Sequence, residues 1–198
     1  MEKEELKNKL DEYTSRNNFW TDKAINQFGY SINLFTTIGI GLLGYLVTNR
    51  NKISKLEYIK DGDINYTLVF YYSSLIIIFI SILFGFISIL SRLYDFRITR
   101  HLALTRKRFL KRKKAKEGLI DSKIIDISKD NYCTVFRKNL FEKIEFINES
   151  HFENGNVPEQ FEELRKSSKI LGAISWKTHK IQILFFMIGI LVLGFSVI

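Results

Sequence analysis

The chain has 198 residues, of which 46% are hydrophobic, and 30 Lys/Arg against 21 Asp/Glu give it a formal net charge of +9. Its single cysteine excludes an internal disulfide and a cysteine-based metal site. The apolar residues are gathered into three blocks without charges, which is typical of an integral membrane protein and argues against a soluble one.

Residues 1–29 are predicted to form a cytoplasmic amphipathic helix. Leu6, Leu10, Tyr13 and Trp20 recur at helical spacing and lead into the first apolar block. The segment carries eleven charges, six of them acidic, and no short apolar core. We therefore expect an uncleaved anchor and no signal peptide.

Three membrane spans are predicted in chain order. The first covers residues 30–49 and the second 67–91, with an external loop at 50–66 between them. The third lies within 179–198, and its uncharged part begins at Ile181. Each uncharged block has about the 17–25 residues that a helix needs to cross the hydrocarbon of a bilayer.

The basic residues predict the orientation of the spans. Residues 92–178 carry twenty Lys/Arg, and eleven of these follow the second span directly. Because basic residues stay on the cytoplasmic side, this segment should be cytoplasmic. The N-terminus should then be cytoplasmic and the C-terminus external, in a multi-pass protein of the cytoplasmic (inner) membrane.

The segment 92–178 is predicted to be a helical domain. The second span should continue as one helix to about Lys116, and a last helix should run from Pro158 into the third span. Between them we expect a break near Gly118, a short strand before Cys133, and a helix from about Thr134 to His151.

Small and polar residues form a stripe along each span. In lipid, small residues let helices approach closely, and polar side chains bond across the contact. The stripes could pack the three helices of one chain, or they could lie between subunits or line a pore. Three stripes exceed what one three-helix bundle needs, which favours a homo-oligomer. Their members are Asn33, Thr37, Gly41 and Gly44, then Ser74, Ser81, Gly85 and Ser88, and finally Gln182 and Gly189.

The cytoplasmic end of the second span carries Arg92, Asp95 and Arg97. A carboxylate beside lipid is costly unless it is paired or faces a bundle interior. Asp95 lies three residues after Arg92, so the two can form an ion pair on one helix face. The alternative is a role for these residues in a gate or a subunit contact.

A run of basic residues follows: Arg108, Lys111, Arg112, Lys113 and Lys114. Next to a span, such a run attracts anionic lipid headgroups. RNA or DNA is the second interpretation, but only Phe109 lies within the run to stack on bases, so we do not expect nucleic acid. The third is pairing with an acidic stretch, in which Glu142, Glu145, Glu149 and Glu153 should share one helix face.

No motif predicts an enzyme. Gly39, Gly41 and Gly44 match the dinucleotide pattern G-x-G-x-x-G, but they lie in an apolar span without a preceding strand. The three histidines lack metal-ligand spacing. His101 follows Arg97 with too few intervening residues for the motif of HEPN ribonucleases. We expect neither catalysis nor a cofactor.

The layout resembles small bacterial membrane effectors of antiviral systems. The residues that prompt this are Phe19-Trp20-Thr21-Asp22-Lys23 before the first span and Tyr94-Asp95-Phe96-Arg97-Ile98-Thr99 after the second. Over roughly residues 15–110 the chain is similar to the SLATT class and to membrane proteins found beside RNA-targeting type VI CRISPR nucleases. That resemblance implies an oligomer that permeabilises or depolarises the inner membrane.

The sequence thus predicts an all-α membrane protein with three spans and a helical cytoplasmic domain. The leading function is a homo-oligomeric, channel-like effector in the lipid bilayer, gated by that domain. The alternative is a membrane anchor that recruits a soluble defence protein through residues 92–178. A transporter subunit is the third hypothesis, and it lacks the usual intramembrane charge or proline break.

Overall fold

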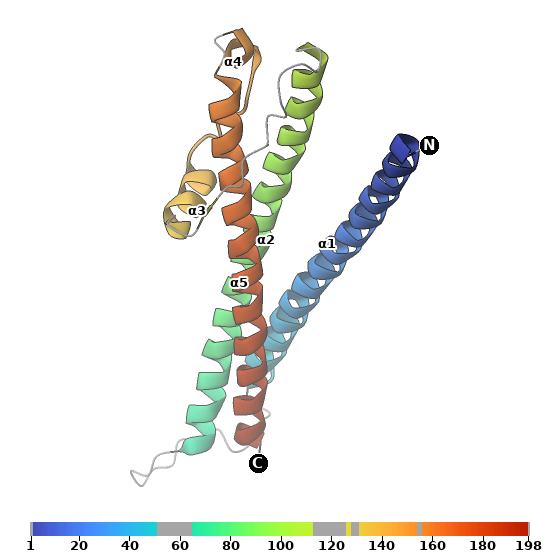
Figure 1. Cartoon of the computed structure of the whole chain (residues 1–198). Coiled ribbons are helices and arrows are strands. Elements are labelled where there is room, and N and C mark those ends of the chain that lie inside the picture. The colour runs from blue at the N-terminus through green and yellow to red at the C-terminus, as the bar shows by residue number, and fades with distance from the viewer. Residues whose placement is uncertain (1, 51–64, 113–125, 128–130, 154–155, 198) are drawn as a thin grey trace. The chain divides into compact units, whose positions relative to one another are not determined.

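The computed structural model describes residues 2–50, 65–112, 126–127, 131–153 and 156–197 (Figure 1). These residues form five helices and no strand, in agreement with the predicted all-α class. The break expected near Gly118 and most of the strand expected before Cys133 lie outside the described residues. The helices are α1 (Glu2–Thr48), α2 (Tyr66–Arg112), α3 (Tyr132–Phe141), α4 (Glu149–Glu153) and α5 (Val157–Val197).

The three long helices have the length and composition to cross a membrane. The qualifying stretches are Thr21–Thr48, Tyr66–Arg106 and Val157–Ser196. A bilayer needs only about 20 residues of helix, so the second and third stretches are longer than a span. Within these stretches, the uncharged segments 67–91 and 181–196 are the parts that have the composition of a membrane span.

Each long helix joins segments that the sequence also predicted to be continuous. α1 contains the N-terminal amphipathic segment and the first span without interruption. α2 runs on beyond the second span as far as Arg112, where the described residues pause. α5 begins at Val157, which places Pro158 in its first turn, where its missing N–H costs no helical hydrogen bond.

The chain divides into two compact units. Unit 1 comprises Met1–Gly85 and Ile183–Ile198. Its buried core contains Leu46, Leu68, Tyr71, Ile78 and Ile82. The Tyr71 side chain is fully buried, and its hydroxyl donates a hydrogen bond of 2.6 Å to the carbonyl of Leu46, which ties α2 to the end of α1. The phenol is thereby satisfied inside an apolar core.

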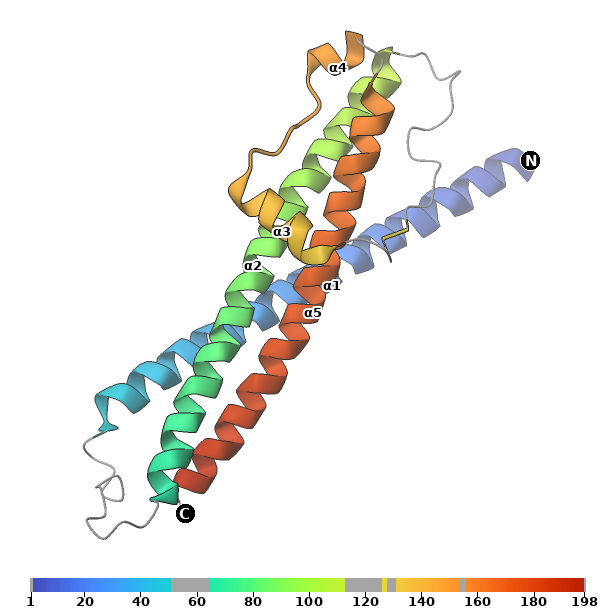
Figure 2. The same ribbon diagram turned by 90° about the vertical axis from the view of Figure 1, so that its left-hand side faces the viewer.

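Unit 2 comprises Phe86–Gln182. Within it, α2 and α5 lie side by side, and α3 packs across them (Figures 1 and 2). The ends of α3 are tied to α5 by an ion pair of 3.1 Å between Lys138 and Glu163 and by Lys177, whose Nζ lies 4.5 Å from the ring centre of Tyr132. Cys133 is exposed on this helix. The buried core consists of Ile98, Leu102, Ile147, Val157, Phe161, Leu164 and Leu171.

The predicted helix from Thr134 to His151 is wrong. α3 ends at Phe141, α4 begins at Glu149, and residues 142–148, here called the strap, are not helical. The strap lacks helical hydrogen bonds. Instead, the side chain of Ile147 is buried, and the strap backbone forms hydrogen bonds with side chains on α2 and α5. Tertiary packing thus overrides the local helical pattern. The shared helix face expected for Glu142, Glu145, Glu149 and Glu153 is therefore wrong, because Glu142 and Glu145 lie on the strap.

Candidate functional site

The stripe on α2 faces the interior of the chain. Ser74, Ser81 and Ser88 repeat every seven residues and are 0%, 1% and 0% exposed, and Gly85 is buried with them. The Ser74 hydroxyl donates 2.7 Å to the carbonyl of Tyr71 on its own helix. The larger residues between them, such as Ile76 and Phe79, are exposed. Of the two interpretations of this stripe, its burial favours packing within one chain.

The stripe on α5 is also buried. Gln182 and Ser196 are 0% and 3% exposed, and Gly189 is buried between them. Gly189 marks the closest approach of α5 to α2 in unit 1, because a Cβ placed there would lie 2.7 Å from Cγ1 of Ile78. Only a residue without a side chain allows this distance, so Gly189 serves helix packing.

A reciprocal pair of serines joins α2 to α5 in unit 2. The Ser88 hydroxyl donates a hydrogen bond of 2.8 Å to the carbonyl of Ser175, and the Ser175 hydroxyl donates one of 3.0 Å to the carbonyl of Ser88. Both residues are fully buried. Two small hydroxyl side chains that bond each other's backbone let the helices approach closely while every polar atom of the pair stays satisfied.

The stripe on α1 behaves differently, because it faces outward. Asn33, Thr37, Gly41 and Gly44 are all exposed. A Cβ added at Gly41 or Gly44 would meet nothing within 4 Å, whereas one at Gly39 would lie 3.1 Å from Ile82. Among the described residues, Asn33 and Thr37 have no side-chain hydrogen bond. The opposite face of α1, with Ile32 and Thr36, is the buried one.

Asp95 links α2 to α5 in unit 2. Its carboxylate accepts hydrogen bonds from Arg92 Nη1 (2.9 Å) and Thr99 Oγ1 (3.3 Å) on its own helix. It also accepts one of 2.6 Å from Ser168 Oγ on α5. The predicted pairing with Arg92 is confirmed, and Asp95 is only 9% exposed. The carboxylate therefore acts as a cross-helix clamp.

The α5 side of this clamp was not predicted from the sequence. A Cβ on Gly172 would lie 3.4 Å from Oδ2 of Asp95, and Ser168 stands four residues before it. Two small residues four positions apart on α5 are the signal that could have predicted the contact. Arg97 does not join the clamp, since its guanidinium lies 5.2 Å from the ring centre of Phe146.

The basic run is described only in part. Arg108 is exposed, while the side chains of Lys111 and Arg112 and all of Lys113 and Lys114 lie outside the described residues. Contact of this run with lipid therefore stays a prediction.

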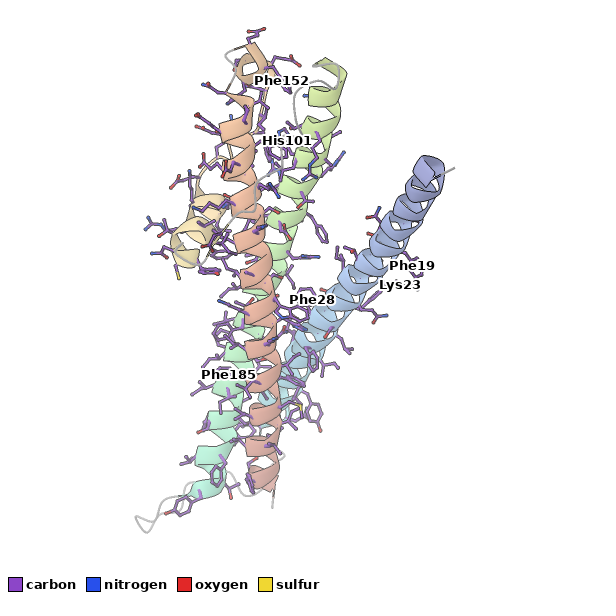
Figure 3. All side chains as sticks on the ribbon, viewed as in Figure 1. Phe19, Lys23, Phe28, His101, Phe152 and Phe185 are labelled. Atoms are coloured by element: carbon purple, nitrogen blue, oxygen red, sulfur yellow. The ribbon has the colours of Figure 1, made fainter. Side chains whose placement is uncertain are left out.

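Near the start of the chain, the exposed side chains of Phe19 and Lys23 point away from α1, and Lys23 Nζ lies 5.6 Å from the ring centre of Phe19 (Figure 3).

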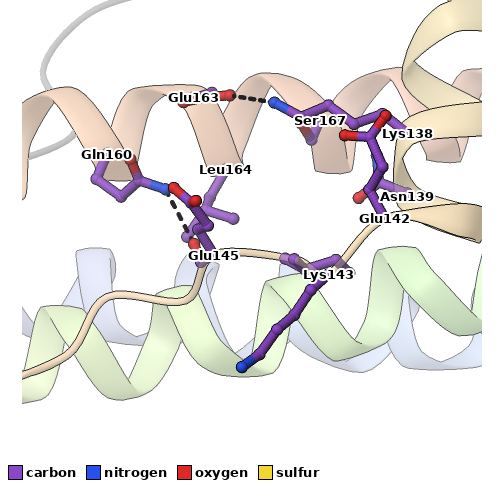
Figure 4. A pocket seen from close by; sticks show the side chains of 10 residues that line it. Lys138, Asn139, Glu142, Lys143, Glu145, Gln160, Glu163, Leu164 and Ser167 are labelled. Carbon is purple, nitrogen blue, oxygen red and sulfur yellow. Dashed lines mark hydrogen bonds and ion pairs between the residues drawn. The ribbon is translucent and has the colours of Figure 1, made fainter.

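A small pocket of about 170 Å³ lies between the end of α3, the strap and α5 (Figure 4). Glu142, Glu145 and Glu163 line it together with Lys138 and Lys143. The hydrogen bond and charge of Glu163 raise the pKa of Lys138. Because both signs of charge line the pocket, the arrangement does not select an ion of one charge.

Comparison of the chain with protein-family models, with curated proteins and with solved structures finds no match. The arrangement of the stripes and of the Asp95 clamp is thus the basis for a functional proposal.

Proposed function

We propose that this chain is a homo-oligomeric, channel-like effector of a bacterial inner membrane, with α1 supplying the surface between subunits. The stripe on α1, consisting of Asn33, Thr37, Gly41 and Gly44, is the observation that carries the proposal. The stripes on α2 and α5 are used for packing inside the chain, and the stripe on α1 is left exposed.

Lipid offers no hydrogen-bond partner to polar side chains that face it. An amide without a hydrogen-bond partner in an apolar medium costs several kcal/mol at most and about 1–3 kcal/mol in proteins. Lipid tails offer Asn33 and Thr37 no partner. A second copy of α1, or water inside an oligomer, satisfies both side chains, and Gly41 and Gly44 allow backbones to approach closely.

A pore in this assembly would be lined by Asn33, Thr37 and Gly41. The α2 stripe, which the sequence also allowed as a pore lining, is not part of the proposal, because the side chains of Ser74, Ser81 and Ser88 are enclosed by their own chain. Residues 92–178 would regulate opening. The membrane-depolarising role in antiviral defence follows the resemblance to the SLATT class and to the proteins beside type VI CRISPR nucleases.

A membrane anchor or scaffold is the second candidate. Its supporting observation is unit 2, a folded, strongly charged body whose glutamates are exposed wherever the structure describes them. In this role unit 2 would recruit a soluble partner and α1 would serve only to hold the chain in the bilayer. The two candidates differ in their demand for self-association.

Replacing Gly41 by leucine tests the α1 surface. We expect the association constant of the subunits to fall tenfold or more, because the added side chain blocks close approach of two helices while the space around Gly41 within one chain is open. The measurement is the mass of the detergent-solubilised protein by light scattering, corrected for bound detergent. Asn33→Leu should additionally reduce ion flux into vesicles.

The matched control is Gly194→Leu, the same substitution at an exposed glycine of α5 that also has open space around it. It should leave the mass unchanged. A wild-type monomer in several mild detergents would contradict the homo-oligomer and leave the anchor as the better proposal. An oligomer without ion flux would retain the α1 surface and remove the pore.

A further inference from the structure

The strap crosses α2 and α5 in unit 2 and is bound to each helix by one backbone hydrogen bond. The amide of Ile147 donates 3.0 Å to Nε2 of His101 on α2. The side chain of Gln160 on α5 donates 2.9 Å to the carbonyl of Glu145. Ile147 is 3% exposed and belongs to the core of the unit. The strap therefore closes this core.

The contact with His101 requires a neutral imidazole. Nε2 can accept the Ile147 amide only while its lone pair is free, so the proton of the neutral ring must be on Nδ1. The ring of Phe146 covers the imidazole at a centroid distance of 4.6 Å. Figure 3 shows His101 on the inner part of α2, with Phe152 of α4 further along the unit. The strap residue before Ile147 therefore contacts the same imidazole.

We propose that His101 is a pH-sensitive tie, which holds the strap on α2 while neutral and releases it when protonated. Protonation turns Nε2 from an acceptor into a donor. Two donors then face each other, and the buried amide of Ile147 loses its partner. The strap can recover hydrogen bonds to water only by leaving the helix.

The surrounding charges favour this direction of response. Burial of the ring and the positive charge of Arg108 lower the pKa of His101. The guanidinium of Arg97 lies over the ring of Phe146, which itself contacts His101, and so adds a second positive charge near the imidazole. α5 meets the strap with the neutral Gln160. Other charged or titratable groups near the strap are Glu142, Lys143 and Glu145 on the strap itself, His151 on α4, and the paired Lys138 and Glu163.

The sign of the pH dependence follows from this lowered pKa. The released state exposes His101, whose pKa then approaches the ordinary value of about 6.5. Below that pH the released state binds a proton that the closed state does not, so acid favours release. Release withdraws Ile147 from Leu102 and Phe161 and so uncovers apolar side chains on α2 and α5. This inference does not depend on the proposed channel function.

Hydrogen–deuterium exchange of the full-length protein in detergent micelles tests the proposal. Between pH 7.5 and 5.5, protection of peptides covering 144–150 should fall by up to about tenfold per pH unit below 6.5, after correction for intrinsic exchange rates. Peptides from the middle of α3 should keep their protection. Unchanged protection of 144–150 across this range would overturn the proposal.

Two variants distinguish the contribution of His101 to the pH response from that of the neighbouring histidine. His101→Gln offers an amide oxygen in place of Nε2 and does not titrate, so the strap should stay protected at both pH values. His151→Gln removes the other histidine beside the strap, which contacts Asn148, and should leave the pH response intact. A response that persists in His101→Gln and disappears in His151→Gln would assign the switch to α4 and contradict our assignment.

Discussion

Gly189→Ala is expected to lower the free energy of unfolding by about 1–3 kcal/mol, the usual cost of overpacking. The new methyl group would lie 2.7 Å from Cγ1 of Ile78 and 3.4 Å from Cγ2 of Ile77. The backbone of α2 is also close, since the amide nitrogen of Ile78 lies at 3.5 Å, so α2 and α5 must separate to accommodate the change. Reversible unfolding in mixed micelles would measure the loss.

Gly194 supplies a matched control on the same helix. A Cβ at this position would meet nothing within 4 Å, so Gly194→Ala should retain wild-type stability or gain slightly from the helix propensity of alanine. Gly189→Ala combined with Ile78→Ala should cost less than the sum of the two single variants, because Ile78→Ala removes the atom at 2.7 Å. Equal losses in both glycine variants would mean that close approach at Gly189 is not the cause.

Asp95→Ala is expected to cost about 2–4 kcal/mol of unfolding free energy. Removing one partner of a buried ion pair costs about 3–5 kcal/mol, and this pair has side-chain exposures of 21% for Arg92 and 13% for Asp95, which places it toward the lower end. The change also removes the acceptor of the Ser168 hydroxyl, and with it one of the hydrogen bonds between α2 and α5. Chemical unfolding in micelles is the appropriate measurement.

A double-mutant cycle separates the two contributions. Ser168→Ala alone should cost about 1–2 kcal/mol, because a hydrogen bond to a charged group is stronger than an ordinary one. The double variant should lose less than the sum, since the two residues share a contact. Glu163→Ala is the control: its pair with Lys138 is more than half exposed on both sides, so the loss should stay within about 1 kcal/mol. Strict additivity of Asp95→Ala and Ser168→Ala would exclude the clamp.

The long helices were predictable because their signals are local. Uncharged blocks of sufficient length define the apolar parts of α1, α2 and α5, and Pro158 marks the start of α5. The pairing of Arg92 with Asp95 also depends only on helical spacing along one element. Each of these features depends on residues within a few helical turns of one another, so a local sequence pattern is enough to predict it.

The features that were predicted wrongly or not predicted at all depend on residues far apart in the sequence. The sequence of the strap predicts a helix. Its actual conformation depends on His101 and Gln160, which lie 46 and 15 residues away from the strap residues that they contact. The three stripes look alike in sequence, yet two are buried and the α1 stripe is exposed, because burial depends on which helix lies opposite. Gly41 and Gly189 show the same contrast: identical residues, one beside open space and one at a tight contact.

The exposed position of Cys133 on α3 makes the natural chain suitable for spectroscopy. Because it is the single cysteine of the sequence, a thiol-reactive spin label or dye would attach at one defined place per subunit without prior mutagenesis. Dipolar coupling between such labels would then report the spacing of unit 2 bodies in an assembly. A fluorescent dye at the same cysteine would allow subunits to be counted by stepwise photobleaching in single vesicles.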